Sequence, residues 1–260
     1  MSDRPDILSR ILERKAERLA AAKRALPADE LERRVSRRPK RRFADSLALP
    51  DRINVIAEVK RASPSRGVIR SDLDPVDVAR AYSAHAAAIS VLTEEDHFQG
   101  SLDTLRAIRT AVTTPLLRKD FIFDRYQLLE AVDAGADAVL LIVAALDRAQ
   151  LGDLLGEAAA LNLDVLVEVH TPVEMETVLH FDHALIGVNN RNLKTFEVDV
   201  STSYDIARMA PSSAVLVAES GIDSRDTIDR LRSAGYSAFL IGEHLMRATA
   251  PGQALRDLVA

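Results

Sequence analysis

Eight short apolar segments rich in Val, Ile and Leu recur along the chain, and their spacing strongly limits the folds it can adopt. From the end of the first segment at Lys60 to the end of the last at Gly242, seven intervals average 26 residues. The segments lack regular polar alternation, which predicts strands that are covered on both faces, as in a parallel sheet. They span residues 53–60, 86–93, 115–119, 136–142, 163–169, 184–189, 214–219 and 237–242.

The sequence between these predicted strands has the pattern of amphipathic helices. Residues 124–136 and 224–236 both run through such a helix into Ala-Gly, a helix stop placed before the next strand. Eight strand–helix units in about 210 residues favour a (β/α)8 TIM barrel, whose usual length is about 250 residues. A doubly wound sheet is the alternative, but it usually has about six strands, and no G-x-G-x-x-G motif follows the first strand.

The first 50 residues precede this repeat and predict a helical extension. Ile7, Ile11 and Leu19 recur among charged residues as in an amphipathic helix, and a second helix is expected to begin near residues 27–29. We therefore expect one α/β domain over residues 1–260, a single (β/α)8 barrel of which residues 1–50 form the N-terminal helical extension.

The same 50 residues are basic, with 14 Lys and Arg against 8 Asp and Glu, whereas the whole chain carries a net charge of −5. The run RRVSRRPKRR at residues 33–42 is of the kind that binds nucleic acid. It has little aromatic interleaving and no groove-reading module around it, so we expect no nucleic-acid partner. A solvated basic helix that adds positive potential near an anionic substrate is the favoured interpretation.

Composition excludes several other classes of protein. The chain has no Cys, which excludes a disulfide framework, a thiolate nucleophile and Cys-based metal sites. The opening residues lack the apolar core of a secretory signal, and the longest apolar run, residues 138–146, is too short to span a bilayer. We expect a cytoplasmic protein with no membrane partner.

Polar side chains follow the predicted strands where each strand ends, and the carboxyl ends of barrel strands carry the active site. They are Glu58 and Lys60 on the first strand, Lys119 on the third, Glu168 on the fifth, Asn189 on the sixth and Glu219 on the seventh. Charged groups in such a poorly hydrated mouth must be paired or they neutralise. Two lysines and three glutamates compensate one another there and include candidates for a proton donor and a proton acceptor.

Three loops at the same rim have the residues of a phosphate site. Ser220 and Gly221 follow the seventh strand, Gly242 and Glu243 follow the eighth, and residues 61–67 include Ser63. Glycine lets backbone N–H groups approach an anion closely, and barrels often hold phosphate between the seventh and eighth loops.

The remaining polar residues receive less specific interpretations. His180 and His183 have no acidic companions at ligand spacing, so no metal site is expected. His170 is interpreted as a loop histidine in preference to a partner of Glu168, and residues 94–96 as a solvated acidic loop. For Phe98 and Phe121, a wall for an aromatic substrate and loop anchoring are equally favoured.

The run VIAEVKRASPSRGVIR from Val55 resembles the signature of the indole-3-glycerol phosphate synthase family. The resemblance continues, over essentially the whole chain, through SVLTEEDHFQGS (90–101), PLLRKDFIFD (115–124), LVEVHT (166–171), IGVNNRNL (186–193), VAESGI (217–222) and FLIGEHLM (239–246). It implies a (β/α)8 lyase of tryptophan biosynthesis. The implied reaction converts 1-(2-carboxyphenylamino)-1-deoxyribulose 5-phosphate to indole-3-glycerol phosphate, CO2 and water, without metal or organic cofactor.

The resemblance also implies roles for individual residues. Lys119 matches the general acid of ring closure, Glu168 the carboxylate that pairs with it and assists dehydration, Lys60 the residue that holds the anthranilate carboxylate, and Glu58 its paired carboxylate and base. Asn189 and Glu219 match substrate-positioning residues, Arg191 lies beside the aromatic ring, and Ser63, Gly221 and Gly242 match the phosphate site, with Ser220 beside it. Some relatives carry Ser in place of Glu243, so only the backbone N–H of Glu243 is expected to face the phosphate.

Two other functions remain open at this stage. One is a Schiff-base aldolase on the same barrel, with Lys119 as nucleophile, which needs a depressed lysine pKa. The other is a binding barrel that keeps its affinity for anions without turnover, although the intact set of Lys60, Lys119 and Glu168 disfavours it. We expect a small phosphorylated substrate as the partner, and a monomer or weak homodimer.

Overall fold

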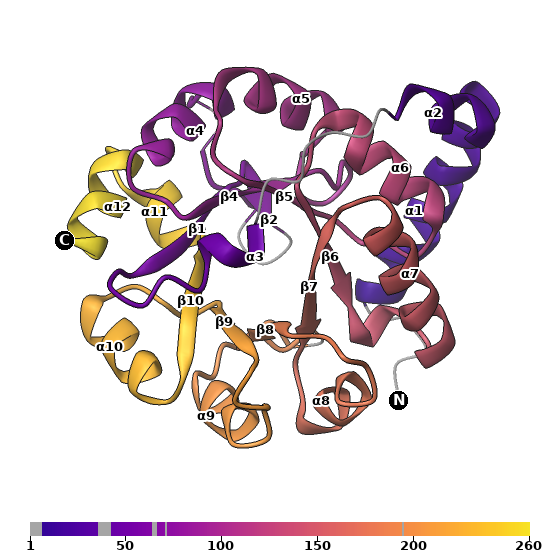
Figure 1. Ribbon diagram of the computed structural model, residues 1–260. Coiled ribbons are helices and arrows are strands. Elements are labelled where there is room, and N and C mark those ends of the chain that lie inside the picture. The colour runs from indigo at the N-terminus through magenta and orange to yellow at the C-terminus, as the bar shows by residue number, and fades with distance from the viewer. Residues whose placement is uncertain (1–6, 36–42, 64–66, 71, 194) are drawn as a thin grey trace.

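The computed structural model describes residues 7–35, 43–63, 67–70, 72–193 and 195–260 of the chain. Eight parallel strands close into a barrel in the order β1-β10-β9-β8-β7-β6-β5-β4, with helices around the outside (Figure 1). The strands are β1 (Asn54–Val59), β4 (Ala88–Leu92), β5 (Leu116–Lys119), β6 (Ala138–Ile142), β7 (Asp164–Val169), β8 (Leu185–Asn189), β9 (Val215–Glu219) and β10 (Tyr236–Ile241). The predicted (β/α)8 barrel is therefore confirmed, and each predicted strand is present.

Helices follow every barrel strand. They are α4 (Pro75–Ser83), α5 (Leu102–Ala111), α6 (Arg125–Ala134), α7 (Arg148–Ala160), α8 (Pro172–Val178), α9 (Ser201–Ala207), α10 (Arg225–Ser233), α11 (Glu243–Arg247) and α12 (Pro251–Val259), with a 3-10 turn η1 (Val143–Ala145) before α7. The predicted Ala-Gly helix stop is present after α6, where Gly135 adopts φ +89°. Among the described residues, no helix is long and apolar enough to cross a membrane.

The core has two layers because successive strand residues point to opposite faces. Outward side chains such as Val55 and Ile89 pack against the helices, whereas inward ones such as Ile56, Leu117 and Leu166 fill the barrel. A short helix, α3 (Phe43–Ser46), was not predicted; Phe43 within it and Leu47 directly after it are buried in the inner layer. The amide of Asn54, the first residue of β1, holds this segment by donating to the backbone oxygens of Leu47 and Leu49. These contacts close the amino end of the barrel and leave the carboxyl end for polar groups.

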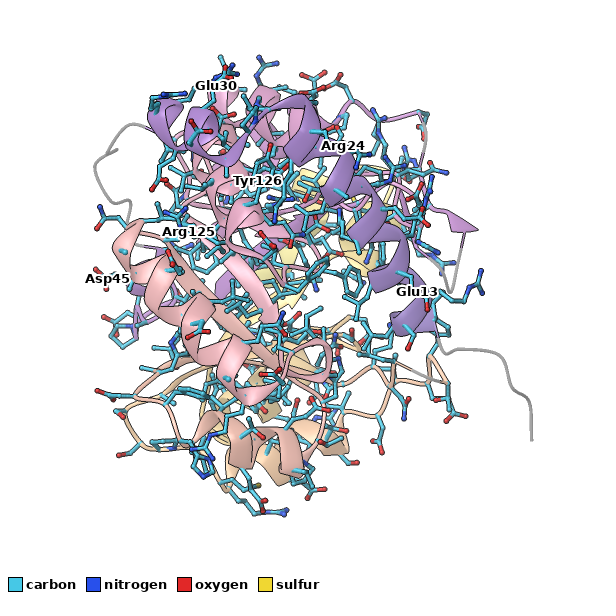
Figure 2. All side chains as sticks on the ribbon, turned by 90° about the vertical axis from the view of Figure 1, so that its right-hand side faces the viewer. Glu13, Arg24, Glu30, Asp45, Arg125 and Tyr126 are labelled. Atoms are coloured by element: carbon cyan, nitrogen blue, oxygen red, sulfur yellow. The ribbon has the colours of Figure 1, made fainter. Side chains whose placement is uncertain are left out.

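The two predicted N-terminal helices are present as α1 (Ile7–Ala25) and α2 (Ala28–Arg34), beside α6 and α7 (Figure 1). Figure 2 shows Tyr126 of α6 beneath them, where its hydroxyl donates to the backbone oxygens of Ala22 and Leu26 at 3.2 and 2.8 Å. Arg125 pairs with Glu32 of α2 at 2.6 Å. These contacts attach the extension to the barrel. The most basic part of the chain, residues 36–42, lies outside the described residues.

The prediction of a solvated acidic loop at residues 94–96 is wrong for Glu94, which is buried, whereas Glu95 is half-buried and Asp96 is exposed. Glu94 is only 2% exposed and accepts three backbone N–H groups of its own loop. Glu95 pairs with buried Lys15 of α1 at 2.9 Å, and Asp96 pairs with Arg18 at 2.5 Å. Basic residues of α1 therefore neutralise an acidic loop of the barrel. The predicted solvated basic helix concerns the basic stretch that includes residues 33–42, and most of that stretch lies outside the described residues.

Candidate active site

A cavity of about 460 Å³ opens at the carboxyl ends of the barrel strands. Eleven of the twelve residues that the sequence singles out line it: Glu58, Lys60, Lys119, Glu168, Asn189, Arg191, Glu219, Ser220, Gly221, Gly242 and Glu243. The twelfth, Ser63, belongs to β2 (Ala62–Ser63), which pairs with β3 (Gly67–Val68) in an unpredicted hairpin after β1. The side chain of Ser63 lies outside the described residues. The barrel thus gathers these eleven candidate residues from the ends of six strands at one mouth.

Lys119 lies at the centre of the charged part of this cavity. Its Nζ is 3.2 Å from Oε2 of Glu168 and 3.6 Å from Oε2 of Glu219. Burial lowers the pKa of Lys119, but Glu168, Glu219 and Glu58 outweigh burial and raise it above its usual range. Lys119 is consequently an ammonium group in the free protein, able to donate a proton to a group that binds beside it.

Two buried carboxyl groups beside Lys119 have opposite pKa shifts. Burial raises the pKa of Glu168, but Lys119 and His170 outweigh it and hold that pKa below its usual range. Burial and then the charge of Glu168 raise the pKa of Glu219 to about 8. One carboxyl is therefore a permanent anion and the other holds a proton near neutral pH, a division that suits acid–base chemistry.

We expect the protonation of Glu219 to make the stability of the protein depend on pH. Between its ordinary pKa and about 8, the folded chain binds a proton that the unfolded chain lacks. The contribution of Glu219 to stability is therefore full at low pH and is lost as the pH rises through about 8. Glu219→Gln lacks this titration. As the pH increases towards about 8, the free energy of unfolding of the variant should therefore rise relative to that of the wild type, by up to about 1.4 kcal/mol per pH unit. Urea unfolding at about pH 5.5 and 8.5 measures this; a difference between the proteins that does not change with pH would contradict it.

Glu58 and Lys60 form a second pair at the end of β1, with Nζ 2.5 Å from Oε1. Glu58 is 3% exposed and points into the barrel, where it fills the space that a side chain at residue 242 would need. A Cβ on Gly242 would overlap its carboxylate. Glycine at residue 242 thus has a steric reason besides the phosphate role that the sequence suggests.

His170 lies in the loop after β7, but it is also the partner of Glu168, the interpretation that the sequence analysis did not favour. Its ring is buried, with Nε2 3.2 Å from Oε1 of Glu168 and Nδ1 3.3 Å from Oε2 of Glu174. Burial opposes the charge of the ring, but the two carboxylates raise the pKa of His170 to about 10. The spacing of two residues along β7 was the sequence signal for this contact.

The loops after β8 and β9 are tied together at the presumed phosphate end. Oδ1 of Asn189 accepts from the Ser220 hydroxyl at 2.9 Å and from the Arg191 backbone N–H at 3.0 Å. Ser220 and Gly221 are both left-handed, with φ +65° and +74°, so the backbone turns sharply beside the cavity. Glycine adopts this conformation without the steric cost that other residues incur.

The Glu243 side chain lies between two arginines. Its Oε2 is 3.5 Å from Nη2 of Arg191, and its Oε1 is 3.4 Å from Nη1 of Arg247. Its negative charge is thus balanced within the cavity wall, which the sequence does not reveal.

Part of the cavity lining is apolar. Phe98 and Phe121 both line the cavity, with ring centroids 6.2 Å apart. Leu193, Phe196 and Val198, in the loop after β8, also line it and were missed; their only signal was a series of apolar residues within a largely polar loop. Such a lining suits a flat apolar ring. Among the described residues, no group of three His, Asp or Glu side chains is arranged to hold a metal ion.

Comparison with known proteins identifies the family. The family model for indole-3-glycerol phosphate synthase matches residues 8–258. The chain belongs to the indole-3-glycerol phosphate synthase family. An indole-3-glycerol phosphate synthase from Burkholderia ambifaria is 50% identical over 254 residues, covering 96% of this chain and 97% of that protein. Another from Burkholderia vietnamiensis is 49% identical with the same coverage. The family resemblance seen in the sequence is therefore confirmed.

Solved structures of other enzymes share the fold of this family member. A 3-hexulose-6-phosphate synthase from Salmonella typhimurium superposes with a TM-score of 0.65 at 14% identity, covering 79% of this chain and 96% of that one. A tryptophan synthase alpha-subunit from Pyrococcus furiosus superposes with a TM-score of 0.59 at 15% identity, covering 79% and 95%. At these identities the likeness concerns the barrel alone.

Proposed function

We propose that this protein is a carbon–carbon lyase that catalyses the indole-3-glycerol phosphate synthase reaction of tryptophan biosynthesis. The substrate is 1-(2-carboxyphenylamino)-1-deoxyribulose 5-phosphate, and the products are indole-3-glycerol phosphate, CO2 and water. The observation that carries the proposal is the Lys119 ammonium group, held between Glu168 and Glu219 at the cavity. An ammonium in that position supplies the proton that ring closure requires.

Ring closure joins the aromatic carbon that bears the carboxylate to C2 of the ribulose chain. As that bond forms, the C2 carbonyl oxygen gains negative charge, and Lys119 protonates it as the general acid. The carboxylate then leaves as CO2 and its bonding electrons return to the ring. In the final step the C2 hydroxyl takes a proton from Lys60 and leaves as water, and Glu168, the permanently ionised neighbour, takes up the proton lost from C1.

The other residues bind and orient the substrate. Lys60 holds the anthranilate carboxylate by charge, and Glu58 orients Lys60 and serves as a base. Asn189, Arg191 and Glu219 position the ribulose and the ring. The proposed phosphate site comprises Gly221 and Gly242, with Ser220 beside it, the backbone N–H of Glu243 and, from the β2–β3 hairpin, Ser63.

A charge placed at the phosphate end is expected to weaken substrate binding. Gly221→Asp should raise KM by at least about tenfold, because a carboxylate and a phosphate a few ångströms apart repel by about 1–4 kcal/mol. Gly221→Asn is the matched control: its shape is nearly the same, it is neutral, and Asn tolerates left-handed φ. Steady-state kinetics of both variants separates the charge from the steric contact with Val198 that any Cβ there makes. Equal KM values for the two variants would contradict the phosphate assignment.

The proposed activity is tested by adding the synthetic ribulotide to the purified protein without metal and following the fluorescence of the indole product. Release of CO2 in equal amount should accompany that signal. Absence of product at high protein concentration would refute the proposal.

A Schiff-base aldolase remains the second enzyme candidate on a barrel of this type. It needs a neutral lysine with a depressed pKa, whereas the carboxylates around Lys119 raise its pKa. Borohydride treatment in the presence of a ketose phosphate should therefore leave Lys119 unmodified.

The proposal extends to the organisation of the protein. We expect one barrel domain with its helical extension, acting in the cytoplasm as a monomer or weak homodimer. The pairing of Lys15 with Glu95 and Asp120 favours a single folding unit, and the absence of Cys suits a reducing compartment. Sedimentation velocity measures the oligomeric state.

A further inference from the structure

His170 is a buried charged group that the proposed reaction does not itself use. It is not among the side chains that line the cavity, yet its ring connects a cavity residue to α8. Each ring nitrogen lies close to a carboxylate oxygen: Nδ1 is in hydrogen-bond geometry with Glu174, and Nε2 forms an ion-pair contact with Glu168 that is not aligned as a hydrogen bond. The ring therefore lies between the Glu168 carboxylate in the active site and the Glu174 carboxylate outside it.

The contacts determine the charge of this ring. An ionised carboxylate only accepts hydrogen bonds, and a neutral imidazole has one N–H and one lone pair. A lone pair on Nδ1 would be repelled by Oε2 of Glu174 at 3.3 Å, so Nδ1 carries a proton. Nε2 lies 3.2 Å from Oε1 of Glu168 without hydrogen-bond alignment, and a second carboxylate at that distance favours the charged form of the ring. The two contacts together favour an imidazolium.

Glu174 fixes the ring in place. Its Oε2 accepts the His170 backbone N–H at 2.7 Å and is also the oxygen that faces Nδ1. The Glu174 backbone N–H in turn donates to Oγ1 of Thr171 at the start of α8. The orientation of His170 is thus set by the turn that joins β7 to α8.

Glu168 consequently has one cation on each oxygen, His170 on Oε1 and Lys119 on Oε2. The other acidic groups that bear on this cluster are Glu219 on β9 and Glu58 on β1. When Lys119 gives its proton to the substrate, it becomes neutral, and Glu168 loses one of its two cationic partners. Without a second cation, Glu168 would take up a proton more readily and be lost as an acceptor for dehydration.

We propose that His170 is a positioning residue, held by Glu174 as a permanent imidazolium that keeps Glu168 ionised and aimed at Lys119 throughout the reaction. This inference rests on the proposed function, because only turnover makes Lys119 lose its charge. It adds a role for the β7–α8 turn, whose residues do not line the cavity.

The test is the pH dependence of kcat in His170→Gln. An opposite charge at this distance lowers a carboxyl pKa by about 1–3 units, so its loss should move the acidic limb of kcat upward by about 1–3 pH units. At high pH the variant should approach the wild-type kcat, and KM should change little. His180→Gln is the matched control, since His180 is exposed at the end of α8, and it should reproduce the wild-type profile.

Other outcomes are equally informative. A folded His170→Gln protein with the wild-type pH profile, or with kcat lowered equally at every pH, would overturn the positioning role. If this variant does not fold, Glu174→Gln replaces it, and an unshifted acidic limb there would overturn the role. The imidazole nitrogen chemical shifts of His170 report the charge of its ring without turnover. A ring that is neutral at about pH 7.5 would refute this inference. A wild-type protein that is inactive on the ribulotide would instead refute the proposed function.

Discussion

Replacing Lys119 with alanine is expected to lower kcat by about 10²–10⁴-fold, the usual contribution of a general acid. The variant retains Lys60 and the phosphate end of the cavity, so the substrate should still bind. The side chain of Lys119 lies at the end of β5, pairs with the Glu168 carboxylate and lies 3.6 Å from Glu219. Its removal therefore also lets Glu168 take up a proton more readily, which moves the acidic limb of the remaining activity to higher pH.

Lys23→Ala is the matched control for this variant. Lys23 lies on α1, and its Nζ pairs with Asp124 at 2.7 Å, away from the cavity-lining residues. Single-turnover rates and fluorescence titration with product separate chemistry from binding in both proteins. If kcat of Lys119→Ala were within a few-fold of the wild-type value, Lys119 would not be the general acid.

Gly187→Ala is expected to impair both stability and turnover, although Gly187 carries no chemistry. A Cβ at this position of β8 would overlap Oε1 of Glu219 and crowd Leu166. The carboxyl group would have to move away from Lys119, or the barrel would have to widen. Overpacking of this kind costs about 1–3 kcal/mol, and displacement of a group beside the reaction should lower kcat by at least about tenfold.

Gly156→Ala provides the control within the same fold. Gly156 lies inside α7, and a Cβ there would meet no atom within 4 Å. That variant should gain about 0.5–1 kcal/mol of stability, because alanine favours the helix. Urea unfolding and steady-state kinetics of the two variants give the comparison; similar behaviour would show that the space beside Glu219 has no importance.

Much of the fold was predictable because its signals are local. A strand covered on both faces appears as an unbroken apolar run, and a helix that stops before the next strand appears as Ala-Gly, as at Gly135. The candidate site was equally predictable wherever a polar residue ends a strand, since closure of the barrel brings all such ends to one mouth. Lys119 and Glu168 are 49 residues apart, yet their charged groups are 3.2 Å apart.

The amino-acid sequence by itself thus determined the repeat, the barrel class, the family and the residue types at the rim. Only the tertiary structure decided which charges pair and which side chains compete for the same space. It assigned His170 to Glu168, Lys15 to the acidic loop after β4, and the space beside Gly187 to Glu219. The reason is physical: backbone periodicity acts between near neighbours in the chain, whereas burial, Coulomb attraction and steric exclusion depend on distances that exist only once the barrel has closed.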